Sequence, residues 1–189
     1  AAAAVAFELG VSEDDIKNGL EEFSGVERRF QLKGCYGDIM VVDDYGHHPE
    51  EVKAVLSAVK DGWKRRAVVV FQPHRYSRTR DLFEEFISAF NEADELIITD
   101  VYAAGEEPIK SASGRALYKA IKKHGHRSVS FIEDINSIPA ELEKKVKAGD
   151  MVITLGAGDV YKVSDRFTEI IKEKYPNGKL SLVNDSKDD

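Results

Sequence analysis

Residues 39–59 read IMVVDDYGHHPEEVKAVLSAV, and this stretch decides the fold. Ile39–Val42 is a short apolar run rich in β-branched side chains, as in a strand that is buried on both faces. A polar loop follows it, and Glu50–Val59 then repeats apolar residues at helical spacing. The stretch is therefore predicted to form one strand–loop–helix unit.

The same unit recurs along the chain. Further short runs rich in valine and isoleucine lie at Ala67–Phe71, Leu96–Thr99, Val129–Ile132 and Met151–Leu155. Amphipathic stretches follow at Arg80–Phe90, Gly114–Lys123, Ser137–Val146 and Val160–Lys172. We expect Gln31–Cys35 to add a strand that pairs with the one beginning near Ile39. Alternating strands and helices predict an α/β fold with a doubly wound, mostly parallel sheet flanked by helices.

The residues before this pattern predict a separate, helical part. Residues 1–23 read as two short helices, and Ser12 is the expected N-cap of the second. The first helix starts without a methionine or a capping residue, so we expect the chain to be cut from a longer protein. The expected parts are the end of a preceding domain at 1–24, a connector at 25–29, a domain at 30–175 and a disordered tail at 176–189.

Composition narrows the class of protein. The 189 residues are 42% hydrophobic, enough for one packed domain, and the net charge is −7. An acidic balance argues against a dedicated nucleic-acid binder. The sequence shows no signal-peptide pattern and no apolar run of the roughly 20 residues that span a bilayer. We therefore expect a cytoplasmic protein without nucleic-acid or membrane partners, whose one cysteine, Cys35, forms no internal disulfide.

Polar residues gather where the predicted strands end. In open α/β sheets, ligands bind beyond the carboxyl ends of the strands. Three of the five histidines and several arginines fall directly after the first two parallel strands. The segments at the four ends that we single out are Asp43–Pro49, Gln72–Arg80, Thr99–Glu107 and Gly156–Asp159. Few of these polar groups are needed to pack a sheet, so together they predict a binding site.

Single motifs at these ends are less specific. His47 and His48 stand beside two aspartates, but adjacent histidines point in different directions and no third ligand is set by spacing, so no metal site is expected. Gly156-Ala157-Gly158 resembles part of a dinucleotide loop, although a tight turn into a helix explains it equally well. Tyr102 and Glu106-Glu107 are interpreted as loop surface rather than as catalysts.

The segment His74–Arg80 carries the strongest charge signal. It places one histidine and three arginines within seven residues. Cationic groups this close repel one another unless an anion is expected, and arginine suits bidentate binding of a phosphate or a carboxylate. The segment is therefore predicted to bind an anion.

Two motifs together resemble the Mur ligase family. They are Asp43–Pro49 and, some two dozen residues later, Phe71–Thr79. Gly25–Phe30, Gly105–Ile109 and Leu155–Asp159 agree with the resemblance, which covers nearly the whole chain except the tail. The motifs are most similar to members that join L-alanine to UDP-N-acetylmuramate. The family resemblance implies a Rossmann-like C-terminal domain, preceded by the last helices of a central ATPase domain.

The activity that the resemblance implies is an ATP-dependent amide ligation in peptidoglycan precursor synthesis. ATP would activate the muramate carboxylate as an acyl phosphate, which the amine of L-alanine would attack. The sequence has no Gly-x-x-x-x-Gly-Lys-Ser/Thr segment, so the phosphate cradle and the main Mg²⁺ ligands are expected upstream. UDP-N-acetylmuramate would also bind mainly to domains outside this chain, and the chain alone is expected to be inactive.

The resemblance assigns four residues to the nucleotide side of the site. Arg29 would reach the nucleotide phosphates, and Asp44 would hold the nucleotide near its ribose. Tyr45 and His47 would line the region between nucleotide and amino acid. Arg29, Asp44 and His47 are the residues expected to take part in catalysis.

Three residues are assigned to the amino-acid side. By resemblance, His74, Arg75 and Arg78 would bind the carboxylate of L-alanine and neighbouring phosphate charge, next to Tyr45 and His47. Arginine is the natural partner of a carboxylate, which agrees with this assignment. Pocket size is not readable from the sequence, so the choice among L-alanine, glycine and L-serine stays open, as does the oligomeric state.

Other functions compete with the ligase. The chain could be a free-standing module that binds a nucleotide or an amino acid without catalysis, or a metal-dependent hydrolase that uses His47, His48 and His74. Within the family, a ligase that recycles murein tripeptide is an alternative. Those members typically differ at Tyr45-Gly46 and at His74-Arg75-Tyr76, which favours L-alanine as the substrate.

Overall fold

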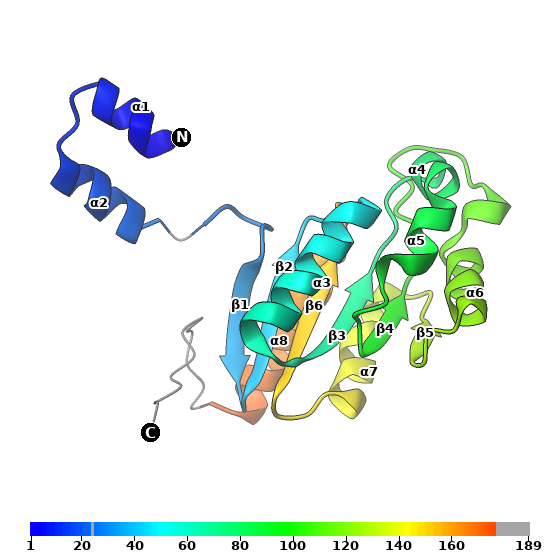
Figure 1. Cartoon of the computed structure of the whole chain (residues 1–189). Helices are drawn as coiled ribbons and strands as arrows, with labels where there is room; N and C mark the ends of the chain where they lie inside the picture. Colours follow the sequence, from blue (N-terminus) through cyan, green and yellow to red (C-terminus); the bar gives the residue numbers. More distant parts are fainter. Residues whose placement is uncertain (24, 177–189) are drawn as a thin grey trace.

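The computed structural model describes residues 1–23 and 25–176 and contains one six-stranded sheet (Figure 1). The strand order is β1-β2-β6-β3-β4-β5, and only β1 runs antiparallel to its neighbour. The strands are β1 Gln31–Tyr36, β2 Ile39–Asp44, β3 Arg66–Phe71, β4 Glu95–Ile98, β5 Val129–Phe131 and β6 Asp150–Leu155. The predicted α/β class, the mostly parallel sheet and the added β1–β2 pairing are confirmed.

Helices cover both faces of the sheet. In Figure 1, α3, α5 and α6 lie in front of it, and α7 and α8 lie behind. The helices that follow the strands are α3 Pro49–Trp63, α4 Tyr76–Asp81, α5 Phe83–Ala89, α6 Gly114–His124, α7 Ile138–Lys145 and α8 Tyr161–Lys174, with 3₁₀ turns η1 Lys110–Ala112 and η2 Ile135–Ser137. The arrangement is the Rossmann-like, doubly wound one that the sequence predicts.

Two hydrophobic cores form because the strand side chains alternate. Val42 and Val69 pack with Leu56 on one face, and Val41 and Val68 pack with the residues of α7 and α8 on the other. All of these strand side chains are buried, so the strands show continuous apolar runs rather than alternation in sequence. Four adjacent strands run parallel, namely β2, β6, β3 and β4. Their carboxyl ends therefore meet at one edge of the sheet, where polar loops follow them.

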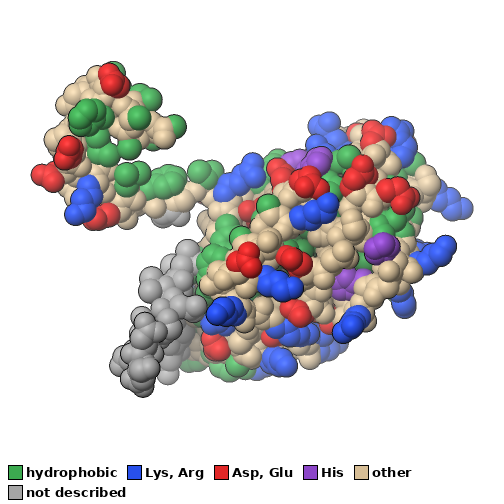
Figure 2. Space-filling model, viewed as in Figure 1, with side chains coloured by type: hydrophobic (Ala, Val, Ile, Leu, Met, Phe, Trp, Pro, Cys, Tyr) green, Lys and Arg blue, Asp and Glu red, His purple; other side chains and the backbone are tan. Residues whose placement is uncertain are grey.

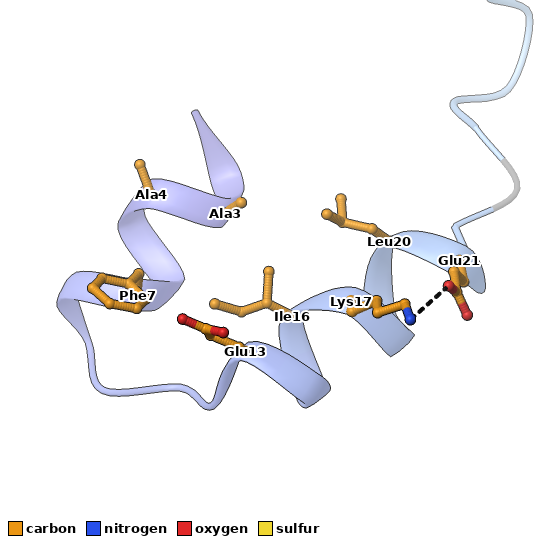
Figure 3. A pocket seen from close by; sticks show the side chains of 8 residues that line it. All are labelled: Ala3, Ala4, Phe7, Glu13, Ile16, Lys17, Leu20 and Glu21. Atoms are coloured by element: carbon orange, nitrogen blue, oxygen red, sulfur yellow. Dashed lines mark ion pairs between the residues drawn. The ribbon is translucent and has the colours of Figure 1, made fainter.

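The N-terminal helices form no such core. They are α1 Ala2–Glu8 and α2 Glu13–Glu21, neither of which buries a residue, and Ser12 caps α2 by accepting from the Asp15 N–H. Apolar side chains are open to solvent there, with Phe7 59% and Leu20 57% exposed. Figure 2 shows this green surface, and Figure 3 shows the hollow of about 570 Å³ that Phe7, Ile16 and Leu20 help to line.

One predicted helix is divided into two in the structure. The stretch expected to be helical from Arg80 to Phe90 is two helices that begin at Tyr76 and break at Leu82. The early start has a tertiary cause, because the side chain of Glu106, from a distant loop, accepts the backbone N–H of Ser77. The break lets Phe86 pack on Phe71 in the core. The tail expected at 176–189 lies outside the described residues, apart from Pro176.

Candidate functional site

The loops after four strands are joined to one another at the polar edge of the sheet. Pairing continues past the strands, because Gln72 N–H donates to the Leu155 carbonyl and Gly156 N–H donates to the Asp44 carbonyl. Beyond β3, a bridge joins His74 to Tyr102, which follows β4. The segments singled out in the sequence therefore form one continuous surface.

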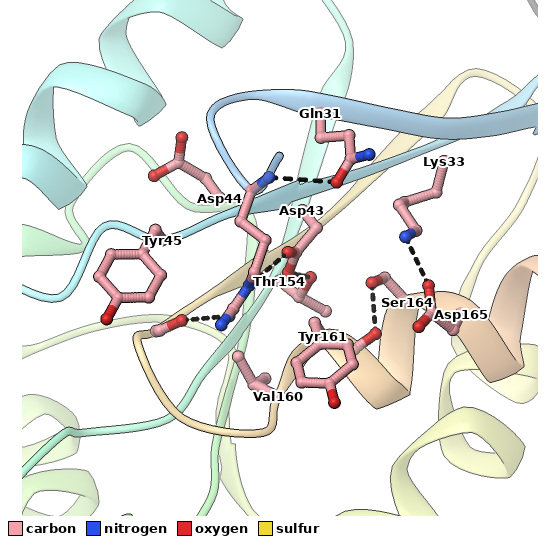
Figure 4. A network of polar contacts seen from close by, with 12 residues as sticks. Gln31, Lys33, Asp43, Asp44, Tyr45, Thr154, Val160, Tyr161, Ser164 and Asp165 are labelled. Carbon is pink, nitrogen blue, oxygen red and sulfur yellow. Dashed lines mark hydrogen bonds and ion pairs between the residues drawn. The ribbon is translucent and has the colours of Figure 1, made fainter. Parts of the chain in front are cut away.

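A partly buried ion pair lies at the end of β2 (Figure 4). Arg28 donates through Nε to Asp43, at 2.9 Å, and the Asp43 side chain is 0% exposed. The second carboxylate oxygen of Asp43 accepts from the Thr154 hydroxyl of β6 at 2.6 Å. Both oxygens of this carboxylate are thus bonded within the chain. The sequence analysis assigned no role to Arg28 or to Asp43.

Asp44 is bonded in a similar way. Its two carboxylate oxygens accept the backbone N–H groups of Phe30 and Gly46, each at 2.7 Å. The first bond holds the connector against β2, and the second closes the turn that leads to His47. The side chain predicted to lie near a ribose is 6% exposed and at present fixes two backbone segments. Its predicted contact with a nucleotide stays a prediction.

Tyr45 and His47 lie next to each other after β2. Their rings meet edge to face with centroids 5.4 Å apart. Nδ1 of His47 lies 2.9 Å from the Tyr45 carbonyl oxygen, which can only accept, so Nδ1 carries the proton in this bond. Nε2 of the neutral ring is then an acceptor. The ring of His74 is 5.8 Å from that of His47, so the structure brings these predicted residues together across two strand ends.

His48 and Pro49 start helix α3. The His48 side chain accepts from the Glu50 N–H, Glu51 reaches back to the His48 N–H, and Pro49 occupies the first turn. Glu51 also accepts from the His47 N–H. These bonds direct the two adjacent histidines to different tasks, because one is a cap and the other faces the neighbouring loop.

The anion site predicted after β3 is built around His74. The rings of His74 and Tyr102 are stacked, with centroids 5.5 Å apart and an angle of 8° between them. Arg78 lies 3.2 Å from Nδ1 of His74, and a guanidinium only donates, so Nδ1 accepts and the neutral ring keeps its proton on Nε2. His74 therefore offers an N–H donor beside an arginine.

Burial and positive neighbours control the charge of His74. Burial lowers the pKa of His74 from its usual value, and the charges of Arg78, His47 and Arg75 lower it further, against a weaker opposing effect of Glu106. Burial first, and the surplus of positive charge second, thus favour the neutral ring. A bound anion would reverse that imbalance, which is what the sequence pattern predicts for this segment.

Helix α4 begins in a strained conformation at Arg75. The φ angle of Arg75 is 68°, in the left-handed region that non-glycine residues rarely adopt, and its N–H donates to the Tyr102 carbonyl. Glu106 accepts from both the N–H and the hydroxyl of Ser77, at 2.8 and 2.6 Å. The Tyr102–Glu106 loop therefore fixes the start of α4, and the side chain of Arg75 is exposed at this edge.

Arg29 differs sharply from the neighbouring Arg28. Its side chain is 56% exposed, and its guanidinium lies 4.0 Å from Glu51 and 5.7 Å from the Tyr45 ring centre. A weakly held arginine at the polar edge fits the predicted contact with a phosphate, which stays a prediction.

The Gly156–Gly158 turn packs tightly against β3. A Cβ on Gly158 would lie 2.4 Å from Oε1 of Gln72 and 2.6 Å from the Tyr102 ring, so no side chain fits there. The same Gln72 oxygen accepts from the Val160 N–H, at the start of α8. The carbonyls of Gly156 and Gly158 accept from Arg28. These contacts explain the glycines by a close turn that leads into α8, and no phosphate contact is needed to account for them.

The acidic groups at this edge do not form a metal site. The carboxylate oxygens of Asp43 and Asp44 accept hydrogen bonds from protein donors, whereas Mg²⁺ requires carboxylates that are free to coordinate it. These two residues therefore do not fit a Mg²⁺ site. Within residues 1–23 and 25–176, no group of three His, Cys, Asp or Glu side chains is arranged to hold a metal ion. In the same described part, no helix is long and apolar enough to cross a membrane.

Three residues of the site were missed or underrated in the sequence. Arg28 stands next to Arg29 in sequence. The feature that could have revealed its role is Asp43, because a carboxylate at the end of a buried strand requires a cation. Tyr102 and Glu106 were interpreted as loop surface. In the structure, Tyr102 stacks on His74, and Glu106 accepts the backbone N–H of Ser77. Only the spatial pairing of the β3 and β4 loops gives them these roles.

Comparison with known proteins identifies relatives of the chain. The profile of the family described as "Mur ligase, glutamate ligase domain" matches residues 28–158. A UDP-N-acetylmuramate–L-alanine ligase from Geotalea daltonii is 54% identical over 173 residues, which cover 92% of this chain and 38% of that protein. The chain thus spans well under half the length of this relative.

Solved structures agree with the fold. A UDP-N-acetylmuramate-alanine ligase from Thermotoga maritima matches with a TM-score of 0.73 and 30% identity, over 90% of this chain and 36% of that one. A MurF ligase from Thermotoga maritima, solved in complex with ADP, matches with a TM-score of 0.63 and 19% identity, over 92% and 38% of the two chains. At that lower identity the second likeness concerns the fold alone.

Proposed function

Because this chain belongs to the Mur ligase family, we propose that it is the C-terminal domain of an ATP-dependent ligase that joins L-alanine to UDP-N-acetylmuramate. The observation that carries the proposal is the pair of arginines, Arg75 and Arg78, that flank the N–H donor of His74 beside His47, at the carboxyl ends of β3 and β2. The name of the relative with 54% identity supports L-alanine as the amino acid. The product would be a peptidoglycan precursor.

The proposed chemistry is an amide ligation through an acyl phosphate. The γ-phosphoryl group of ATP passes to the muramate carboxylate, which releases ADP. The amine of L-alanine then attacks the acyl carbon, the tetrahedral intermediate expels phosphate, and the amine loses a proton. Positioning and charge neutralisation dominate the catalysis of such steps, so donors that fix the amino acid have a direct effect on rate.

The residues after β3 would hold the L-alanine carboxylate. A carboxylate accepts two parallel N–H bonds from one guanidinium, which Arg75 or Arg78 supplies. Nε2–H of His74 offers a third donor beside them. With the carboxylate held on this side, the amine points away from it, toward the region that Tyr45 and His47 line between the two strand ends.

Nucleotide contacts of this chain would come from the connector and the end of β2. Arg29 reaches the phosphates in the proposal, because it is exposed and weakly paired. Asp44 supports that contact by holding Phe30, and it meets the nucleotide near the ribose. ATP and Mg²⁺ would bind mostly to a central domain, of which α1 and α2 are the last helices. Their exposed apolar side chains would pack within that domain.

The activity is tested on the complete protein. Phosphate release is measured with ATP, Mg²⁺, UDP-N-acetylmuramate and L-alanine, and each component is omitted in turn. Release that requires all four supports the proposal. Release with a murein tripeptide but not with L-alanine would place the chain in a recycling ligase instead. An absence of release in every mixture, with ATP still bound, would favour a binding module without catalysis.

A further inference from the structure

The guanidinium of Arg28 makes more hydrogen bonds within the protein than a ligand-binding arginine needs. Its guanidinium donates through Nε to Asp43, through Nη1 to the Gly158 carbonyl at 3.1 Å, and through Nη2 to the Gly156 carbonyl at 2.5 Å. These three acceptors lie on β2 and on the turn after β6. The guanidinium therefore joins the connector to two strand ends at once.

Aromatic rings cover the guanidinium as well. Its central carbon lies 5.1 Å from the ring centre of Tyr45 and 4.9 Å from that of Tyr161, on α8. Figure 4 labels both tyrosines, together with Thr154, whose hydroxyl donates to Asp43. The plane and the edge of the guanidinium are thus both in contact with the protein, and a phosphate would have to displace these contacts to reach it.

The backbone around Arg28 is strained and is held by specific bonds. Arg28 and Phe30 have φ angles of 57° and 44°, in the left-handed region that is strained for residues other than glycine. Three bonds compensate. The Arg28 N–H donates to the Gln31 side chain, the Phe30 N–H donates to Asp44, and the Arg28 carbonyl accepts from the Tyr45 N–H. Strain that persists in this way indicates a conformation that the surroundings impose.

The strained turn directs two adjacent arginines to opposite sides. Arg28 points into the corner between β2 and β6, where its side chain is 21% exposed. Arg29, held between Arg28 and Phe30, is 56% exposed, and its guanidinium lies 5.7 Å from the ring centre of Tyr45. If the Arg28 contacts were lost, the turn would relax and Arg29 would no longer be held in this direction.

We propose that Arg28 is a positioning residue that clamps the connector to the ends of β2 and β6 and thereby presents Arg29 and Tyr45 to the nucleotide. The last part rests on the proposed function, whereas the clamp itself does not. Lysine does not replace this arginine, because an ammonium ion lacks the planar fork that reaches three acceptors and stacks between two rings.

The clamp is tested first without any activity. Amide hydrogen exchange is followed by NMR in the 189-residue chain and in its Arg28→Lys, Arg28→Ala and Asp43→Asn variants, with Arg166→Ala as the control. Arg166 has a single exposed ion pair with Glu169. We expect the Phe30 and Tyr45 amides to exchange about tenfold faster or more in the three clamp variants, while β3 amides keep their protection. Unchanged Phe30 and Tyr45 exchange in Arg28→Lys would overturn the proposal, even if Arg28→Ala does not fold.

The effect on Arg29 is tested in the complete ligase by a double-mutant cycle. Phosphate release is compared for Arg28→Lys, Arg29→Ala and the double variant. If Arg28 acts in part through Arg29, the loss of kcat/KM for ATP in the double variant is smaller than the product of the two single losses. Losses that multiply would mean that Arg28 acts independently and would overturn this part. A wild-type protein that shows no ligation refutes the proposed function but leaves the exchange result on the clamp standing.

Discussion

Two polar corners lie on the same edge of the sheet and differ in how their charges are matched. The Arg28 corner contains Arg28, Asp43 and Thr154, with the cation bonded to a buried carboxylate. The His74 corner contains His74, Arg75 and Arg78. There the carboxylate of Glu106 is bonded to Ser77, and its charge only partly offsets the positive groups.

This difference distinguishes a charge pair that stabilises the fold from a group of charges that is suited to bind a ligand. A buried charge pair whose remaining bonds are also made holds the protein together, and removing one member leaves the other uncompensated. A cluster with surplus charge on an accessible surface is incompletely matched until a ligand of opposite charge arrives. We therefore propose that the Arg28 corner serves folding and that the His74 corner binds an anion.

The largest effect is expected from breaking the Arg28 corner. Asp43→Ala leaves the Arg28 guanidinium without its carboxylate and should lower the free energy of unfolding by about 3–5 kcal/mol. Urea denaturation of the 189-residue chain measures this, with Arg166→Ala as a surface control expected to change it by less than about 0.5 kcal/mol. A loss for Asp43→Ala no greater than the control would show that the pair is not structural.

A smaller, purely kinetic effect is expected from Arg29, the exposed arginine beside that corner. In the complete ligase, Arg29→Ala should lower kcat/KM for ATP by roughly ten- to a hundredfold, since it removes a charge-assisted bond to phosphate. The KM for L-alanine should stay near the wild-type value. Steady-state kinetics with each substrate varied measures both, and Lys53→Ala on α3 serves as the control. A change confined to L-alanine would reverse the assigned sides of the site.

The smallest effect is expected from the titration of His74. The pKa of His74 is lowered in the folded state, so the unfolded chain binds this proton more readily. The contribution of His74 to the free energy of unfolding is therefore intact above about pH 6.5 and is lost as the pH falls below that value. Denaturation at a series of pH values should show this loss, and His74→Gln should reduce it. Inorganic phosphate should raise the pKa of His74 in an NMR titration relative to chloride at equal ionic strength. A pKa of His74 that falls in phosphate would contradict an anion site.

The sheet was predictable because its signal is local. Runs such as Ile39–Val42 and Met151–Leu155 are apolar along their whole length, which predicts strands buried on both faces. The strand-end rule then indicates where polar residues meet. The bounds of α4 were not predictable, since the Glu106 side chain that caps it lies 29 residues away from Ser77 in sequence.

The candidate site was predictable in part. The density of positive charge at His74–Arg80 predicts an anion site, and the family motifs indicate roles for Arg29, Tyr45 and His47; these roles stay predictions. Arg28 was not found, because a pair of adjacent arginines does not reveal which one turns inward. That choice depends on the left-handed turn at Arg28 and Phe30 and on acceptors more than a hundred residues away.

The central claim is that the His74 corner binds the amino acid, and one measurement tests it directly. The KM for L-alanine is determined in the complete protein for Arg75→Ala and for Arg80→Ala, whose exposed side chain in the same helix pairs with Asp81. The account predicts that Arg75→Ala raises the KM for L-alanine roughly thirtyfold or more, as for a lost charge partner, while Arg80→Ala does not and the KM for ATP stays within about threefold. An Arg75→Ala variant with the same KM for L-alanine as Arg80→Ala would contradict it.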